Sequence, residues 1–102
     1  EIISENDFFD YDAKYNGKSK EITPARIDKE LTNQIFNISR KLYQDLKLKG
    51  IIRVDFIIKE KSPYIIEINT IPGFSKESII PKMLNCAKIE ISDFINEQIE
   101  NI

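Results

Sequence analysis

The chain has 102 residues, which is enough for one small domain with a modest core and too few for a two-lobed enzyme. Hydrophobic residues make up 41% and charged residues 31%, so the composition is that of a folded globular domain and excludes a disordered chain. The net charge is -2 and lysines alternate with acids along the sequence, which disfavours a nucleic-acid partner.

The first 24 residues predict a short strand followed by a long loop. The strand is expected at residues 1–3, and the stretch 4–24 mixes aromatic, acidic and lysine side chains without helical or strand periodicity. Loops of this length are uncommon in compact domains and are often lids or binding loops. We therefore expect a functional loop here.

A long helix is predicted over residues 28–48. Its apolar residues recur every three or four positions, which marks one face of a helix. These residues are Leu31, Ile35, Ile38, Leu42 and Leu46. Asp28 is suited to cap the start of the helix, Lys47 and Lys49 suit the dipole at its end, and Gly50 is expected to stop it.

Two strands at 51–58 and 64–70 are both rich in β-branched and aromatic residues. We expect an antiparallel hairpin with a loop of about three to five residues. A turn-rich loop then leads to a short helix over 78–88, with Pro81 in its first turn, and to an amphipathic C-terminal helix capped by Ser92. This order predicts an α+β fold, with the hairpin packed by a long helix and C-terminal helices.

Two residue types limit the chemistry that this chain can perform. It has no histidine, which excludes histidine-based triads and most zinc sites. Its one cysteine, Cys86, can form no intrachain disulfide and is expected to be a small buried residue on a helix. Carboxylates, arginine, lysine, tyrosine, serine or backbone amides must therefore carry any reaction.

The predicted hairpin gathers polar side chains on one face. Side chains alternate along a strand, so Arg53 and Asp55 share a face, as do Glu67 and Asn69. If the even-numbered apolar residues of both strands cover one core, the register brings all four polar side chains into one cluster. The same odd-numbered face also carries the isoleucines Ile51, Ile57 and Ile65. We therefore expect the four polar side chains to lie in a partly buried cleft.

The residue types in this cluster suit phosphoryl transfer. Two carboxylates and an amide oxygen are the ligands that Mg²⁺ prefers, usually shared with substrate phosphates. The guanidinium of Arg53 is a permanent, planar donor for a phosphate or a developing oxyanion. The alternation alone also allows ordinary cross-strand ion pairs on an open sheet face, so the pattern leaves both interpretations open.

Five stretches of this sequence carry a resemblance to a known family. GIIRVDF, IIEINTIPGFS and SIIPKM resemble, in this order, the C-terminal signature of the D-alanine-D-alanine ligases, which are ATP-grasp enzymes. Upstream, FFDYDAKY is similar to the active-site lid of that family, and TPARI to the step at which its long helix begins. The resemblance implies that residues 1–102 are a single partial domain, the C-terminal portion of an ATP-grasp domain. Residues 1–24 would be a strand and the lid, and residues 25–102 the helix, hairpin, substrate loop and C-terminal helices.

The resemblance also implies roles for the residues of the hairpin and the loop that follows it. Asp55, Glu67 and Asn69 would hold two magnesium ions, for which manganese could substitute, against the phosphates of ATP. Arg53 would stabilise the acyl phosphate and the tetrahedral intermediate. The backbone amide of Gly73 would help to form an oxyanion hole, since glycine allows close backbone approach.

Further roles fall on the next helix and on the lid. Ser78 and the amide of Ile79 would hold the carboxylate of the second D-alanine, at a helix start that suits an anion. Lys14 would reach the transferred phosphate, and Tyr15 would help to close the lid and favours an amine nucleophile. Taken singly, Lys14 and Tyr15 could be surface residues, Gly73 a turn former and Ser78 a helix cap.

The function implied for the parent protein is ATP-dependent ligation of two D-alanines, through a D-alanyl phosphate, for peptidoglycan precursor synthesis. The expected setting is the cytoplasm, with no membrane or nucleic-acid partner, and the parent is expected to be a homodimer. The N-terminal domain and the central lobe that grips ATP are missing, so the chain alone is expected to be inactive. Two alternatives remain: another ATP-grasp carboxylate-amine ligase, because Glu-x-Asn recurs among them, and a non-catalytic binding module.

Overall fold

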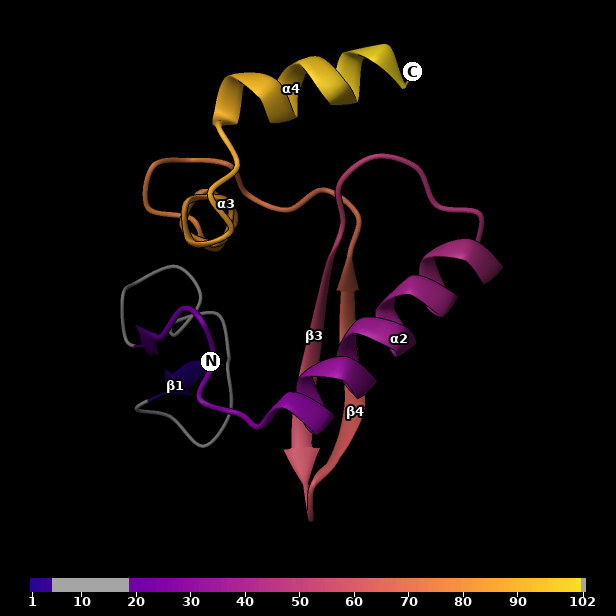
Figure 1. Cartoon of the computed structure of the whole chain (residues 1–102), viewed down its shortest axis with the longest axis vertical. Coiled ribbons are helices and arrows are strands. Elements are labelled where there is room, and N and C mark those ends of the chain that lie inside the picture. The colour runs from indigo at the N-terminus through magenta and orange to yellow at the C-terminus, as the bar shows by residue number, and fades with distance from the viewer. Residues whose placement is uncertain (5–18, 102) are drawn as a thin grey trace.

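The computed structural model describes residues 1–4 and 19–101, and its elements are shown in Figure 1. In chain order they are β1 (Ile2–Ser4), β2 (Ser19–Glu21), α2 (Lys29–Asp45), β3 (Arg53–Lys59), β4 (Ser62–Asn69), α3 (Ile79–Cys86) and α4 (Ile91–Glu100). The strands form two separate antiparallel pairs, β1 with β2 and β3 with β4. The predicted α+β class is confirmed.

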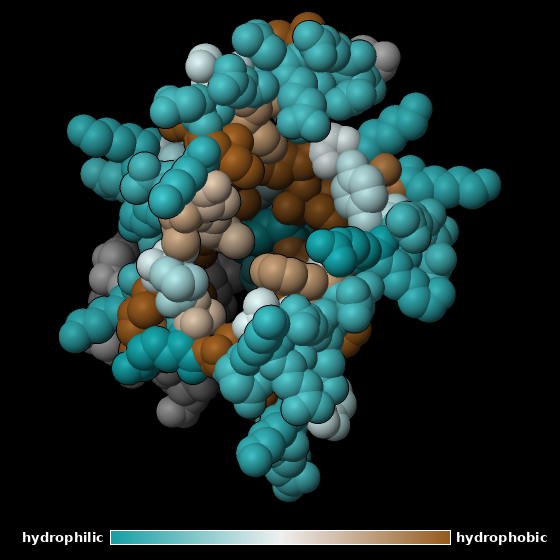
Figure 2. All heavy atoms as spheres, in the orientation of Figure 1, coloured by the Kyte–Doolittle hydropathy of each residue, from teal (hydrophilic) through white to brown (hydrophobic). Residues whose placement is uncertain are grey.

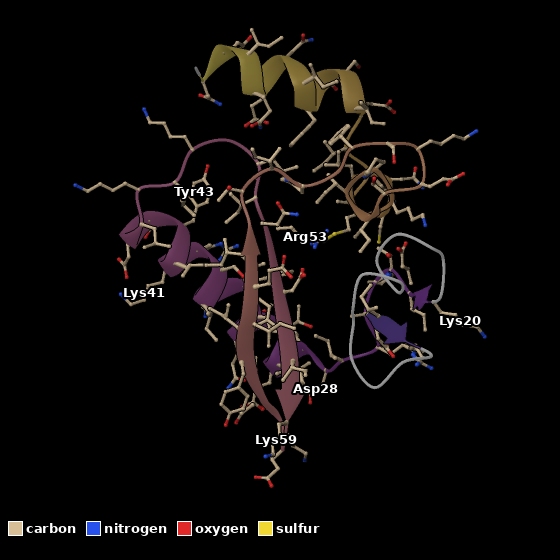
Figure 3. The ribbon with its side chains drawn as sticks, turned by 180° about the vertical axis from the view of Figure 1, so that it is seen from behind. Lys20, Asp28, Lys41, Tyr43, Arg53 and Lys59 are labelled. Atoms are coloured by element: carbon tan, nitrogen blue, oxygen red, sulfur yellow. The ribbon has the colours of Figure 1, made fainter. Side chains whose placement is uncertain are left out.

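The hairpin of β3 and β4 is the axis around which the other elements are arranged. Helix α2 lies along it, and α3 and α4 lie beyond the end opposite its turn (Figure 1). Arg53 and Lys59 mark the two ends of β3 in Figure 3. In the described part of the chain, no helix is long and apolar enough to cross a membrane.

The N-terminal strand pair differs from the prediction. Residues 19–21 were expected to belong to the loop, but they form β2, in which Glu21 pairs with Ile2 and Lys20 with Ile3. The pairing continues past the strands, since the amide of Ile22 donates to the carbonyl of Glu1 at 2.8 Å. Because Ser-Lys-Glu has no strand-forming pattern of its own, the partner strand sets its conformation. The rest of the predicted lid, residues 5–18, lies outside the described residues.

An ion pair joins the start of this strand pair to the segment that follows it. The guanidinium of Arg26 donates to both carboxylate oxygens of Glu1, at 2.9 and 2.7 Å. These side-chain hydrogen bonds, followed in importance by the backbone amide and the charge of Arg26, lower the pKa of Glu1 from 4.5 to about 2. The pair therefore favours the ionised carboxylate.

The pKa of Glu1 gives a pH prediction. Because the folded-state pKa is depressed, the stabilising contribution of this pair is fully present above about pH 4.5 and is lost as the pH falls towards 2. An NMR titration of the side-chain carboxyls of the chain should give Glu1 a midpoint near 2, and the Arg26→Gln variant should return it towards 4.5. A midpoint that does not move in Arg26→Gln would contradict the assignment.

Helix α2 begins as predicted and ends earlier. The Oδ1 atom of Asp28 accepts a hydrogen bond from the amide of Leu31 at 2.7 Å, so the predicted cap is confirmed. The helix was expected to run to residue 48 and stop at Gly50, but it ends at Asp45. Lys47 takes the left-handed conformation that ends it, with a φ of 52°, and the amide of Leu48 bonds to the carbonyl of Tyr43 at 3.0 Å.

The end of α3 follows the same pattern. Helix α3 was expected to extend to Lys88, but Lys88 has a φ of 59°, and the amide of Ile89 donates to the carbonyl of Leu84 at 2.9 Å. This arrangement satisfies the last carbonyls without a glycine. The left-handed backbones of Lys47 and Lys88 therefore end α2 and α3. Lys47 and Lys49, which were expected to suit the dipole at the end of the long helix, lie beyond the last turn of α2.

Two predictions about the C-terminal helices are wrong. Ser92 was expected to cap the last helix, but Glu90 is the cap residue and Ser92 lies in the first turn of α4, because the helix begins directly after the turn at Lys88. Cys86 was expected to be buried, but it is exposed at the end of α3. Residue 102, the last apolar residue of the predicted stripe, lies outside the described residues.

The hairpin turn is tighter than predicted. The strands continue to Lys59 and Ser62, so the loop contains two residues rather than about three to five. Glu60 and Lys61 both have positive φ angles, 53° and 63°, as a type I′ turn requires. Pro63, which lies between the two predicted strands, instead pairs with Ile58 inside β4, and proline is tolerated on an edge strand.

The turn gives a stability prediction. Glu60 and Lys61 carry a Cβ in a backbone region that favours Asn-Gly, so Glu60→Asn with Lys61→Gly should raise the free energy of unfolding by about 1 kcal/mol. Chemical denaturation of the full-length protein measures this change. As a control, Ser62→Gly, one residue later in β4, should destabilise the hairpin, because its glycine falls in an extended strand. No gain from the turn exchange would contradict the type I′ geometry.

The core of the described residues is small. Among these residues only Pro72, Ile80 and Leu84 are buried, with Ile80 and Leu84 at 6% and 9% exposure. The hairpin's apolar residues near the turn are exposed, and Ile71 is 87% exposed. Figure 2 shows a hollow lined by apolar residues, and a cavity of about 440 Å³ lies between α2, β3 and α3. Much of the apolar surface of this chain is therefore available for packing.

Candidate functional site

The register of the hairpin brings the predicted polar residues together. Arg53 pairs with Asn69 and Asp55 pairs with Glu67, so two alternate rungs, separated by the pair of Val54 and Ile68, carry four polar side chains. Residues directly opposite in an antiparallel pair have Cβ atoms about 4.5–5.5 Å apart. The predicted cluster is confirmed as an arrangement of residues at the end of the hairpin away from its turn.

A β-bulge limits how far the predicted alternation extends. The register shifts after Asp55, so that Phe56 pairs with Ile65 and Ile66 is left out of the pairing. The expectation that Ile65 shares the face of the polar residues is therefore wrong, because its partner is the even-numbered Phe56. Ile57 and Ile65 are also exposed, at 52% and 40%, so these two isoleucines do not enclose the site as a buried cleft would.

Arg53 and Asp55 form the central ion pair of the cluster. The Nε atom of Arg53 donates to Oδ1 of Asp55 at 2.8 Å, and an Nη atom donates to Oδ2 at 3.1 Å. Each side chain is only 18% exposed, so the pair is partly shielded from solvent. A bidentate arginine–carboxylate pair in this setting fixes the orientation of both groups. The guanidinium is therefore held against the carboxylate of Asp55.

The oxygen atoms of the cluster suit a hard cation. Asp55 and Glu67 supply carboxylate oxygens on opposed strands, and Asn69 adds an amide oxygen that also accepts the amide of Ile71 at 3.0 Å. An amide oxygen has a second lone pair, so this bond leaves room for a further contact. Among residues 1–4 and 19–101 no three acidic, histidine or cysteine side chains gather as a metal site. Two carboxylates with an amide still fit Mg²⁺, because it takes its other ligands from phosphates and water.

The loop after β4 brings Gly73 against Ser78. A Cβ placed on Gly73 would lie 3.0 Å from the Oγ atom of Ser78, closer than side chains normally approach. The hydroxyl of Ser78 is held in turn by Ser75, whose amide donates to it at 3.2 Å and whose own hydroxyl lies 2.8 Å away. Gly73, Ser75 and Ser78 therefore form one compact turn at the start of α3.

Ser78 occupies the cap position of α3 without capping it. Its side chain makes no cap hydrogen bond and bonds back to Ser75, while its amide donates to the carbonyl of Ser75 at 2.9 Å. Ile79 is the first residue of the helix, so its amide is one of the donors with no partner inside the helix. The two residues predicted to bind a carboxylate thus meet at a helix N-terminus, which favours anions.

The contact between Gly73 and Ser78 can be tested by a double-mutant cycle. Gly73→Ala should lower the free energy of unfolding by about 1 kcal/mol, because the new methyl group presses on the Ser78 hydroxyl and its bond to Ser75. The penalty should shrink in a Ser78→Ala background, where that hydroxyl is absent. Chemical denaturation of the four full-length proteins measures both effects. An equal penalty in the two backgrounds would rule out the contact.

Some residues around the site were not expected from the sequence. Ser75 orients Ser78, and the ring of Phe74 stacks on that of Phe94, with centroids 5.9 Å apart and an angle of 8° between the planes. The stacking ties the loop to α4. A Ser-x-x-Ser spacing before a helix is the signal that could have indicated Ser75. The predicted lid residues, Lys14 and Tyr15, lie outside the described residues.

Comparisons with solved structures identify the fold. The chain superposes on a crystal structure of D-alanine-D-alanine ligase from Bacillus anthracis with a TM-score of 0.78 and 34% identity, over 98% of this chain and 33% of that one. A second structure of the Bacillus anthracis ligase, complexed with ATP, gives a TM-score of 0.69 and 32% identity, over 76% and 27% of the two chains. The fold is that of the C-terminal part of an ATP-grasp domain.

Comparisons of sequence identify the family. Residues 1–100 match the sequence profile of the family described as D-ala D-ala ligase C-terminus, and the chain belongs to that family. It is 51% identical to the D-alanine-D-alanine ligase of Flavobacterium johnsoniae over 98% of its length, and 46% identical to that of Bacteroides fragilis over 99%. The chain spans only 31% and 32% of these two relatives.

Proposed function

We propose that the protein to which this chain belongs joins two D-alanines with the energy of ATP, for peptidoglycan precursor synthesis in the cytoplasm. The observation that carries the proposal is the register that sets Arg53 opposite Asn69 and Asp55 opposite Glu67, in a chain of this ligase family. In this proposal the chain supplies the metal-binding hairpin and the loop for the second substrate.

In the hairpin, Asp55, Glu67 and Asn69 would hold magnesium, with two ions as our expectation and manganese as a substitute. When bound, the metal would neutralise charge on the phosphates of ATP. Arg53 bonds to Asp55 at 2.8 Å and is permanently charged, and in this proposal it would donate hydrogen bonds to an acyl phosphate beside the carboxylates. These residues would hold a D-alanyl phosphate for attack.

In the following loop, the Ser78 hydroxyl and the Ile79 amide would bind the carboxylate of the second D-alanine. They would leave its deprotonated amine free to add to the activated carbonyl carbon, which gives a tetrahedral intermediate. This intermediate would collapse to the amide as the carbon–oxygen bond to phosphate breaks, with the nitrogen losing a proton to the departing phosphate or to water. The amide of Gly73 would donate to the oxyanion that develops in this step. The absence of a side chain at Gly73, where a Cβ would meet Ser78 at 3.0 Å, supports a role that needs close backbone approach.

The remaining parts of the proposal rest on the resemblance of the sequence to the family. Lys14 would contact the transferred phosphate, and Tyr15 would help to enclose the reacting groups. The first D-alanine and the adenine of ATP would be bound by the parts of the protein that the relatives have outside this third of their length. We further propose that the full-length protein is a homodimer and that this chain alone is inactive.

The hairpin carboxylates provide the test of this function. In the full-length protein, Asp55→Asn and Glu67→Gln should each lower the rate of D-alanine-dependent ATP hydrolysis by about 100-fold or more, because each removes a charge from the metal site. Measuring released phosphate with D-alanine and ATP checks this. Glu60→Gln, at the exposed tip of the same hairpin, is the matched control and should keep the full rate. Wild-type-like ATP consumption in both carboxylate variants would overturn the proposal.

A further inference from the structure

Helix α3 is held from opposite sides. Ile80 and Leu84, one turn apart, are the buried residues that anchor it to the rest of the chain, at 6% and 9% exposure. Lys82 lies midway between them, about 200° around the helix from each, so it projects from the other side. There its Nζ atom donates to Oε2 of Glu21 at 2.7 Å.

Glu21 belongs to a different part of the fold. It lies in β2, where it pairs with Ile2 of β1, and is separated from Lys82 by 61 positions in the sequence. Figure 1 shows α3 beside this strand pair. The Glu21 side chain is 21% exposed and that of Lys82 48% exposed, so the carboxylate is the better shielded partner. The ion pair therefore joins the N-terminal strand pair to the helix.

The ion pair between Lys82 and Glu21 acts on the first turn of α3. This turn begins at the groups proposed to bind the second D-alanine, the Ser78 hydroxyl and the Ile79 amide. Side chains on a helix tilt towards its N-terminus, so Lys82, in the first turn, lies over the segment that starts at Ile79. Apolar contacts on one side set the distance of a helix from its neighbours but are not directional. A charged hydrogen bond on the opposite side restrains its rotation, and with it the direction of the Ser78 hydroxyl and the Ile79 amide.

We propose that Glu21 and Lys82 are positioning residues for the second substrate: their ion pair orients the N-terminus of α3 so that Ser78 and Ile79 meet a carboxylate. This inference rests on the proposed function and adds residues outside its binding groups. It requires that the pair affects binding of the carboxylate substrate and leaves the phosphate-handling hairpin alone. Since the pair is partly exposed, its effect is modest.

The test uses the full-length protein with Glu21→Gln, Lys82→Gln and the exchanged pair Glu21→Lys with Lys82→Glu. Steady-state rates are measured by varying D-alanine at saturating ATP, and then ATP at saturating D-alanine. Because two D-alanines bind, separate constants are fitted for them, and the KM for D-alanine is the constant for the second. Each single variant should raise the KM for D-alanine by roughly two- to fivefold, with kcat and the KM for ATP within about twofold of wild type. The exchanged pair should restore the KM for D-alanine, because the two side chains can bond again with their charges reversed.

A matched control separates this effect from a general effect of lost surface charge. Lys41 forms an exposed ion pair with Asp45 at 2.8 Å within α2, so Lys41→Gln should leave both KM values unchanged. Thermal unfolding, followed by circular dichroism, should give melting temperatures for the singles close to that of wild type. These results together would support a positioning role.

Other outcomes overturn one proposal or both. If wild type is active and the singles change both KM values equally, change kcat alone or change nothing, the positioning role is wrong and the proposed function stands. Failure of the exchanged pair to restore the KM for D-alanine, with a normal melting temperature, also overturns the positioning role. A wild-type protein that consumes no ATP with D-alanine overturns the proposed function, and this inference with it.

Discussion

The register of β3 against β4 is the constraint on which the site depends. It places Asp55 directly opposite Glu67, and like charges in that position oppose strand pairing. Arg53, two rungs away on the same strand, donates two hydrogen bonds to Asp55 and offsets part of that repulsion. The hairpin thus places two carboxylates opposite each other, which a sheet built only for stability would avoid. It also holds the guanidinium of Arg53 against one of them. Such an arrangement is more typical of a binding site than of a structural sheet.

Elements with a strong local pattern could be predicted from the sequence, and those set by a partner could not. The long helix follows from its apolar spacing and from Asp28, whose carboxylate caps it. Strand β2 was missed because Ser-Lys-Glu extends only through its pairing with β1. The helix ends were misplaced because Lys47 and Lys88 adopt a left-handed backbone that glycine usually takes. Propensity is a weak guide where a few hydrogen bonds decide a conformation.

The candidate site also has one part that could be predicted from a local sequence pattern and one part that could not. Alternation was sufficient to predict that four polar side chains of the hairpin share one region, because every side chain there follows from the register. It was not sufficient for the loop, in which Ser75 and Gly73 meet Ser78 through a turn of several residues. Nor could it find the bond from Lys82 to Glu21, because no local pattern links positions so far apart. The site therefore combines a part defined by one register with a part defined by tertiary contacts.

The bulge at Ile66 determines which residue lies opposite Asp55. On the turn side of the bulge, the register pairs Phe56 with Ile65. Continued without the extra residue, that register would place Ile66 opposite Asp55 and turn Glu67 to the other face, because side chains alternate along a strand. The bulge adds one residue to β4 at this point, so Glu67 meets Asp55 instead. One inserted residue therefore makes the difference between two carboxylates that lie opposite each other and two that point to different faces of the sheet.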